Sequence, residues 1–443
     1  AAPRAGDARP DEAEMTSVAG QVPELGGYYF DAAGELVVSL TDPARAEAAR
    51  TALAGVAQRG NGRTRVRAAR YTFLQLRGWR DAWSGALLEV PGVSFVDLDE
   101  AANQVVVGIA DPAARARVLD LLRPAGVPVP AIGFEAAGSV RRHELVEYAP
   151  YLYAAPAQGD SVTSYRRPLE GGLKLTYRKS SDPNMAVTCT LGFVARLNGL
   201  RVVVTASHCS MRHWDGDNTI YYQSVPGADR YFGYEYRDPN GSSCGFMSIN
   251  VCRNADASAA YVDAGAADNP GYIARPLGPP PEGRNPYVTI AGSRVIDAAN
   301  PRFRVTGRGA PEVNQPVDKV GATTGWTRGR VARTCVDVNA DRSNSKLRCQ
   351  TFASYSSGQG DSGAPVFMAF ADGTATLMGV HWGATEDGAY SVYSSMARVE
   401  MDLGSLSIVA GSGSTPPPDG GGGSPPGEGG GGPPGGCGVE CIS

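Results

Sequence analysis

Two stretches in the N-terminal part of the chain repeat one order of apolar and polar positions. GELVVSLTDPARAEAARTAL (34–53) and NQVVVGIADPAARARVLDLL (103–122) each start with an apolar run typical of a strand, pass through Asp-Pro, and continue as an Ala/Arg-rich amphipathic pattern typical of a helix. Asp42 and Asp111 are of a residue type that caps helix N-termini. The proline after each aspartate is favoured at the first helical position, which supports the same helix starts. The pattern predicts a small α+β domain with an internal repeat over 26–136.

The segments on either side of this predicted domain lack its periodicity. Residues 1–25 are expected to form a flexible N-terminal extension, and residues 137–166 mix Gly, Pro, Ser and basic residues. The second segment therefore predicts an exposed connector and processing region, because proteases cut such segments.

The pattern changes again from about 167 to 409. Short β-branched runs such as LRVVVTAS (200–207) and APVFMAF (364–370) alternate with Gly/Asn/Pro/Asp turns, which predicts a β-sandwich or barrel. The Gly/Pro-rich sequence of residues 410–443 cannot bury apolar surface, so it predicts a disordered tail.

Composition narrows the possible partners. The 443 residues are enough for about two or three domains. The formal net charge of -4 gives no basic surface for nucleic acid or anionic lipid. No apolar run is long enough for a membrane-spanning helix, so we expect none.

The cysteines indicate an oxidising compartment. None occurs in the first 188 residues, and the even number in short-range couples favours disulfides in a secreted, extracellular protein. Zinc is the alternative, but paired CxxC spacing is missing and the Cys-His cluster HCSMRH (208–213) stands alone. We expect neither a metal site nor a cofactor. The eight cysteines are Cys189, Cys209, Cys244, Cys252, Cys335, Cys349, Cys437 and Cys441.

GQGDSGAPV (358–366) places Ser362 in a glycine-rich turn, where it is a candidate nucleophile. A serine hydroxyl needs a base to take its proton and a carboxylate to orient that base. His208 directly follows an apolar run in VVVTASHCS, a position at which an isolated histidine is more often structural than catalytic. The four histidines of the chain are His143, His208, His213 and His381.

VTASHC and GQGDSGAPV closely resemble the histidine and serine motifs of the chymotrypsin-like serine peptidases, in the right order over 167–409. CTLGF (189–193) and VGATTGWTRGRV (320–331) are similar to the bacterial secreted members of the α-lytic protease and streptogrisin type. The resemblance implies a mainly β fold with a double antiparallel β-barrel. It also implies that the N-terminal α+β domain is a pro-region, which assists folding and inhibits the mature enzyme.

The resemblance also indicates which aspartate completes a triad. The family places its aspartate just before a buried apolar run, and ADASAAYV provides that run after Asp256. Asp263 and Asp268 are the other candidates, but Asp263 is followed only by AGAAD.

The implied roles follow from the motifs. Ser362 attacks the peptide carbonyl, His208 serves as general base and then acid, and Asp256 holds the tautomer of the histidine. The backbone N–H groups of Gly360 and Ser362 form the oxyanion hole, where glycine leaves the backbone turn unrestricted.

The resemblance implies disulfides between Cys189 and Cys209 and between Cys335 and Cys349. The pairing of Cys244 with Cys252 depends on their proximity in the sequence. A link between Cys437 and Cys441 is only a guess, and their role stays open.

Two departures from the family concern the serine loop. In the animal trypsin-like members, a newly cut N-terminus inserts and its ammonium pairs with the aspartate before the serine. No IVGG-like sequence that could form such an N-terminus occurs at the connector, so another cation should balance Asp361. We hypothesise a buried ion pair between Asp361 and Lys319, with a plain surface lysine as the alternative.

The second departure concerns the specificity pocket. Gly358 stands where many relatives have a cysteine, so the pocket disulfide is absent. Ser356 at the base of the pocket favours apolar or aromatic substrate side chains, whereas His381 could recognise acidic ones; Glu386 and Asp387 lie in the pocket loop, and the choice stays open. The residues expected to bind substrate are Ser356, His381, Trp382 and Gly383.

These patterns predict a secreted serine endopeptidase made as a precursor. It would act on proteins or peptides as a monomer, with its own N-terminal domain as folding aid or inhibitor. The alternatives are a catalytically inactive secreted binding protein with a protease fold, and an esterase that uses the same triad.

Overall fold

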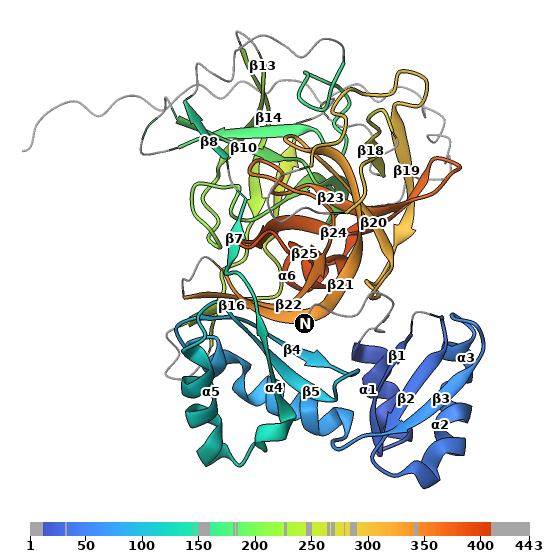
Figure 1. The fold of residues 1–443 in the computed structure, drawn as a ribbon. Helices are drawn as coiled ribbons and strands as arrows, with labels where there is room; N and C mark the ends of the chain where they lie inside the picture. Colours follow the sequence, from blue (N-terminus) through green and yellow to red (C-terminus); the bar gives the residue numbers. More distant parts are fainter. Residues whose placement is uncertain are drawn as a thin grey trace, which may run out of the picture. The chain divides into compact units, whose positions relative to one another are not determined.

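The computed structural model describes most of the chain between Glu12 and Ile408 (Figure 1). The predicted tail over 410–443, with Cys437 and Cys441, lies outside the described residues. The gaps within the described range are 32, 144, 149–159, 180–181, 183–184, 226–227, 245–249, 264–265, 267–270, 279, 284–289 and 341–343. Among the residues that are described, no helix is long and apolar enough to cross a membrane.

The N-terminal part contains almost all the helices that the structure describes. Its elements are α1 (Glu12–Gln21), β1 (Leu25–Phe30), β2 (Leu36–Leu40), η1 (Pro43–Arg45), α2 (Ala46–Ala52), α3 (Ala54–Ala57), β3 (Thr64–Ala68), α4 (Phe73–Leu87), β4 (Val93–Asp99), β5 (Gln104–Ile109), α5 (Ala114–Leu122), η2 (Arg123–Ala125), η3 (Val129–Ala131), β6 (Ile132–Ala136), β7 (Val140–Arg142) and β8 (Leu145–Tyr148).

Both predicted strand-helix repeats are present. Strand β2 leads through Asp42 into η1 and α2, and β5 leads through Asp111 toward α5. The Asp42 carboxylate accepts a hydrogen bond from the N–H of Ala44, and the Asp111 carboxylate accepts one from Ala113, both at 2.9 Å. Each aspartate therefore satisfies a backbone donor that the start of a helix leaves free.

The prediction of a flexible extension over 1–25 is wrong for residues 12–21, which form helix α1. Met15, Val18 and Ala19 of this helix are buried in the N-terminal hydrophobic core. The helix is short and only weakly amphipathic in sequence, so its stability comes from this packing and not from local propensity.

The C-terminal part is built from strands, which confirms the mainly β fold class. Its elements are β9 (Lys174–Arg178), β10 (Met185–Thr190), β11 (Phe193–Leu197), β12 (Leu200–Thr205), β13 (Ile220–Val225), β14 (Ala228–Arg237), β15 (Ser242–Cys244), β16 (Asn250–Arg253), β17 (Ser258–Val262), β18 (Tyr272–Ala274), β19 (Arg302–Arg308), β20 (Pro316–Gly321), β21 (Gly325–Asn339), β22 (Ser345–Ala353), β23 (Pro365–Ala369), β24 (Thr374–Thr385), β25 (Ser391–Ser395), α6 (Met396–Leu403) and β26 (Leu406–Ser407).

Two large sheets organise these strands. Over the described residues, a nine-stranded sheet runs in the order β26-β11-β12-β17-β14-β13-β9-β10-β8, and a fourteen-stranded sheet centres on β22-β25-β24-β23-β20-β21. The three consecutive valines of β12 are all buried and belong to one continuous core that also includes residues of the second sheet. The loops that leave β12 and enter β17 and β23 therefore start from rigid, buried strands.

The N-terminal part extends the second sheet. Strand β4 pairs antiparallel with β21, with Val96 opposite Asp337 and Phe95 opposite Val338. Beside this seam, the buried Arg333 of β21 donates to Asp97 (2.6 Å) and also pairs with Glu135. A continuous sheet and a buried charge cluster thus join the N-terminal part to the C-terminal part.

Several described residues of the segment 137–166 are paired or buried, which differs from the exposed connector that its composition predicts. Strand β7 pairs antiparallel with β24, and Val140 is completely buried. Strand β8 pairs with β10, and Ser161 and Val162 are also buried. Composition could not reveal this, because the partner strands lie far away in the sequence.

Glu235 on β14 is a buried acid whose ionisation affects stability. Its side chain accepts a hydrogen bond from the N–H of Asp217 (2.7 Å), but burial and the nearby charges of Asp217 and Asp238 raise the pKa of Glu235 to about 8. The folded chain therefore keeps a proton that the unfolded chain has lost. Stability should fall as the pH rises from about 5 to about 8.

We expect Glu235→Gln to remove this pH dependence, because glutamine stays neutral. Relative to the wild type, the variant should gain up to about 1.4 kcal/mol per pH unit in this window. Urea unfolding at several pH values measures the difference. A constant difference between the two proteins over the whole window would contradict the assignment.

Candidate active site

His208, Asp256 and Ser362 meet between the two sheets. His208 follows β12, Asp256 lies in the loop between β16 and β17, and Ser362 lies in the loop before β23. The Ser362 Oγ is 2.7 Å from Nε2 of His208, and the Nδ1 of His208 is 3.0 Å from Oδ2 of Asp256. All three residues have no exposed surface. The structure thus brings together the nucleophile, base and carboxylate expected from the motifs.

The carboxylate of Asp256 is fixed at both oxygens. Oδ1 accepts a hydrogen bond from the backbone N–H of His208 (3.0 Å), while Oδ2 faces the imidazole. Burial alone would raise the pKa of Asp256, but the charge and hydrogen bonds of His208, together with Arg142, hold that pKa well below its ordinary value. An ionised carboxylate in this position can hold one tautomer of the histidine and stabilise the imidazolium that forms on proton transfer.

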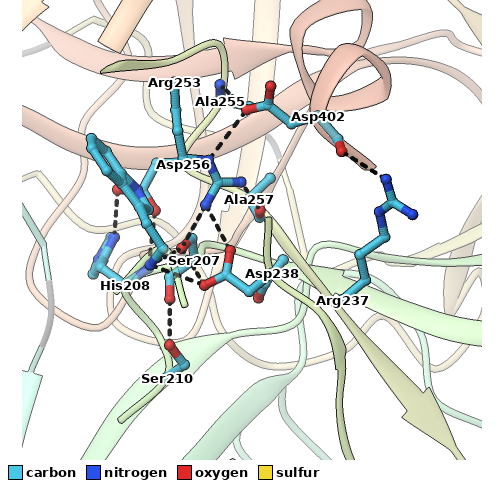
Figure 2. Close-up of polar contacts among 12 residues, drawn as sticks. Ser207, His208, Ser210, Arg237, Asp238, Arg253, Ala255, Asp256, Ala257 and Asp402 are labelled. Atoms are coloured by element: carbon cyan, nitrogen blue, oxygen red, sulfur yellow. Dashed lines mark hydrogen bonds and ion pairs between the residues drawn. The ribbon is translucent and has the colours of Figure 1, made fainter. Parts of the chain in front are cut away.

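A buried network that the sequence analysis missed supports both loops. Figure 2 shows Arg253 between Asp238 and Asp402. The Nη1 of Arg253 donates to Asp238 (2.6 Å) and to the hydroxyl of Ser207 (3.1 Å), and its Nη2 donates to the carbonyl of Ala257 (2.8 Å). Ser207 directly precedes the histidine, and Ala257 directly follows the aspartate. A single arginine therefore holds the two loops in register.

The serine loop is anchored by a buried ion pair. Lys319 Nζ lies 2.9 Å from Oδ2 of Asp361, and neither side chain is exposed. The hydroxyl of Thr324 donates to Oδ2 (2.6 Å), and the N–H groups of Thr323 and Thr324 donate to Oδ1 (2.9 and 3.1 Å). Burial would raise the pKa of Asp361, but the charge of Lys319 and these hydrogen bonds keep it below its ordinary value. The two threonines belong to VGATTGWTRGRV, so the hydrogen bonds of this hairpin hold Asp361, the residue before Ser362.

Gly360 supplies a backbone donor two residues before Ser362. Its φ of +93° lies in the left-handed region, which side chains strain and glycine adopts freely. In this conformation its N–H donates to the carbonyl oxygen of His143 (2.7 Å). The donor expected to hold an oxyanion therefore holds a peptide carbonyl of the N-terminal segment.

The N-terminal segment lies along β24 up to this carbonyl. The N–H of His143 donates to the carbonyl of Trp382 (3.1 Å), and the oxygen of this carbonyl lies 3.3 Å from the Oγ of Ser362. The paired residues of β7 and β24 are Arg142 with Gly383, Arg141 with Ala384, and Val140 with Thr385. Residues 140–143 thus occupy the position that an extended peptide would take beside the nucleophile.

The residues expected to bind substrate surround the end of this segment in different ways. The ring of His381 is 5.6 Å from that of His143, and its Nδ1 lies 3.1 Å from the hydroxyl of Tyr355. Trp382 and Gly383 present their backbones to the segment, while the Trp382 indole is buried. Ser356 is also buried, and its hydroxyl accepts from the N–H of Ile290 (3.0 Å).

The two acidic residues of the pocket loop contact the N-terminal segment. Glu386 pairs with the guanidinium of Arg141, and its N–H donates to the carbonyl of Ser139 (2.8 Å). Asp387 accepts a hydrogen bond from the N–H of Gly138 (2.6 Å). Both acids therefore bind residues that precede His143.

Three disulfides connect the expected pairs. They join Cys189 with Cys209, Cys244 with Cys252, and Cys335 with Cys349. The first links β10 to the loop of the histidine, which gives this loop a covalent anchor. Within the described part of the chain, no group of three or more potential metal ligands occurs.

The fold is similar to solved bacterial serine proteases, although no family model and no curated protein matches the chain. Thermobifida fusca protease A is 18% identical over 55% of this chain and 98% of its own, with a TM-score of 0.36. The α-lytic protease homolog N4 is 19% identical over 54% and 98%, with a TM-score of 0.35. Cellulomonas bogoriensis chymotrypsin is 19% identical over 55% and 98%, with a TM-score of 0.34.

Proposed function

We propose that the protein is a secreted serine endopeptidase that is made as a precursor. The observation that carries the proposal is the line from Asp256 through His208 to Ser362, which ends beside a peptide carbonyl held by the Gly360 N–H. A serine that only forms part of a turn would need neither His208 as a base nor the Gly360 N–H beside a peptide carbonyl.

The chemistry follows from this geometry. His208 Nε2 takes the proton as Ser362 Oγ bonds to the carbonyl carbon, and the negative charge on the carbonyl oxygen is held by the N–H groups of Gly360 and Ser362. Collapse breaks the C–N bond, and the leaving amine takes the proton from His208. Water then repeats these steps on the acyl-enzyme and releases the acid.

The N-terminal part acts as folding aid and inhibitor in this proposal. Strand β4 continues the second sheet, so it could template β21, and residues 140–143 lie along β24 up to Gly360, where a substrate would bind. The precursor would be inactive toward other substrates until this segment is cut and released, and we propose that the enzyme works as a monomer.

The bond that the precursor cuts in itself is then His143–Glu144. Its carbonyl is the one that Gly360 holds. Intramolecular cleavage is favoured because the segment is tethered in the cleft, which replaces a bimolecular encounter by a preformed contact.

Labelling with a fluorophosphonate, followed by intact mass and peptide mapping, tests this function. We expect one label on Ser362 of a chain that begins at Glu144. His208→Ala keeps the serine but removes its base, so this variant should stay unlabelled and uncut. A folded, processed wild-type chain without label would disprove the enzyme.

A further inference from the structure

Arg142 places a positive charge inside the catalytic site. Its Nε lies 3.1 Å from Oδ2 of Asp256, the same oxygen that faces Nδ1 of His208. The side chain of Arg142 is only 9% exposed, and that of Asp256 is not exposed at all. This contact is therefore a buried, charge-assisted hydrogen bond, which is stronger than the same pair at the surface.

The guanidinium also has an aromatic contact. It lies over the ring of Trp214, 5.6 Å from the centroid, where a cation is attracted by the negative face of the ring. Trp214 is itself held in place, because its backbone N–H donates to Asp238 (3.1 Å) and Arg253 lies over the same ring. Asp256 and Trp214 thus form a built site for a planar cation.

The neighbouring arginine provides an internal comparison. Arg141 pairs with Glu386, but their side chains are 52% and 33% exposed. Water and salt screen such a rim pair, so it contributes little. The segment therefore carries two successive arginines, of which only Arg142 enters a buried acidic site.

We propose that Asp256 and Trp214 form a guanidinium-binding subsite for the second residue before the scissile bond, the position that Arg142 holds. This inference rests on the proposed function, since it assigns the residue after Arg142 to the bond that is cut. The catalytic carboxylate then has a second task, which is to select substrates with arginine at that position.

Sharing one carboxylate oxygen affects binding more than turnover. A bound guanidinium engages the same Oδ2 that orients His208, so it should strengthen substrate binding without strengthening the base. The preference for arginine is therefore expected in KM, and kcat for an arginine peptide should not exceed that for the matched neutral peptide.

Peptide substrates test the subsite without changing the protein. The processed wild-type enzyme is given acetyl-Val-Arg-Arg-His with a fluorogenic amide, and peptides in which either arginine is replaced. Alanine or citrulline next to the histidine should lower kcat/KM by about 10- to 100-fold, through KM. Alanine at the preceding position should lower it by less than about fivefold. Equal losses at both positions would overturn the inference.

A second measurement does not need catalysis. In the full-length precursor with Ser362→Ala, amide hydrogen exchange reports how firmly residues 140–143 are held. Adding Arg142→Ala should speed exchange in this segment by about tenfold or more, while Arg141→Ala changes it by less than about fivefold. If these variants behave alike, the subsite is wrong. If they differ as expected but no peptide is cut, the subsite stands and the proposed function fails.

Discussion

Ser362→Ala is expected to lower peptide hydrolysis by a factor on the order of 10⁶ and to leave the precursor at full length. Alanine cannot form the acyl-enzyme, and the remaining groups lose their effect because they act on the serine as a unit. His208 Nε2 is 2.7 Å from the hydroxyl that is removed. Hydrolysis of a peptide amide and the intact mass of the purified chain measure the two effects.

The same substitution at an exposed serine is the matched control. Ser242→Ala changes the same atoms on β15, away from the triad, so the variant should cut itself and hydrolyse peptides like the wild type. A Ser362→Ala precursor that still breaks its own His143–Glu144 bond in pure form would exclude this serine as the nucleophile. It would also exclude processing by the intramolecular route.

The residues of the triad could be predicted because each carries a local signal. Ser362 lies in a glycine-rich turn, His208 lies three residues after the end of β12, and Asp256 lies two residues before the start of β17. Their assignment depends on the resemblance of VTASHC, GQGDSGAPV and ADASAAYV to the motifs of the chymotrypsin-like family, because a histidine after a strand is more often structural. The pair of Asp361 and Lys319 was also predicted from the resemblance, because the N-terminal ammonium that balances this aspartate in animal members has no counterpart in the sequence and another cation is needed.

Arg142 and Arg253 could not be predicted in the same way. Arg142 contacts an aspartate 114 positions later, and Arg253 joins Asp238, just after β14, to Asp402 in α6. Nothing in their neighbouring residues distinguishes them from surface arginines, which are far more common. Their roles depend on which strands pair, and the pairing of β7 with β24 is set by three-dimensional packing.

The fold shows the same division. The repeated strand-helix pattern and its capping aspartates were visible, because capping acts between residues two positions apart. The burial of α1 and the joining of β4 to β21 were not visible, since both depend on contacts with distant parts of the chain. Composition made the segment before β8 look exposed, although pairing buries Val140.

Lys319→Met is expected to have the largest effect on stability, at about 3–5 kcal/mol of unfolding free energy. The substitution leaves the carboxylate of Asp361 buried without its cation, beside the nucleophile. Activity should fall as well, because Asp361 accepts hydrogen bonds from the N–H groups of Thr323 and Gly358 and so fixes the conformation of the loop that carries Ser362. Urea unfolding and peptide hydrolysis of the processed enzyme measure the two losses.

The pH dependence distinguishes the lost ion pair from lost packing. In the wild type the pKa of Asp361 is held below its ordinary value, so its contribution is present above about pH 4 and is lost as the pH falls further. Without Lys319, burial should raise that pKa, so the folded variant would keep a proton and lose stability as the pH rises. The difference between wild type and variant should therefore widen from acidic to neutral pH.

Two further variants separate the charge from the shape. Lys319→Met combined with Asp361→Asn removes both charges, so it should be more stable than Lys319→Met alone and should lose the added pH dependence. Lys179→Met makes the same change at a half-buried lysine and should have little effect. An unchanged melting temperature and unchanged activity in Lys319→Met would show that the loop is held by its threonine and backbone hydrogen bonds alone. In that case the balance of charge at Asp361 would have no part in forming the active site.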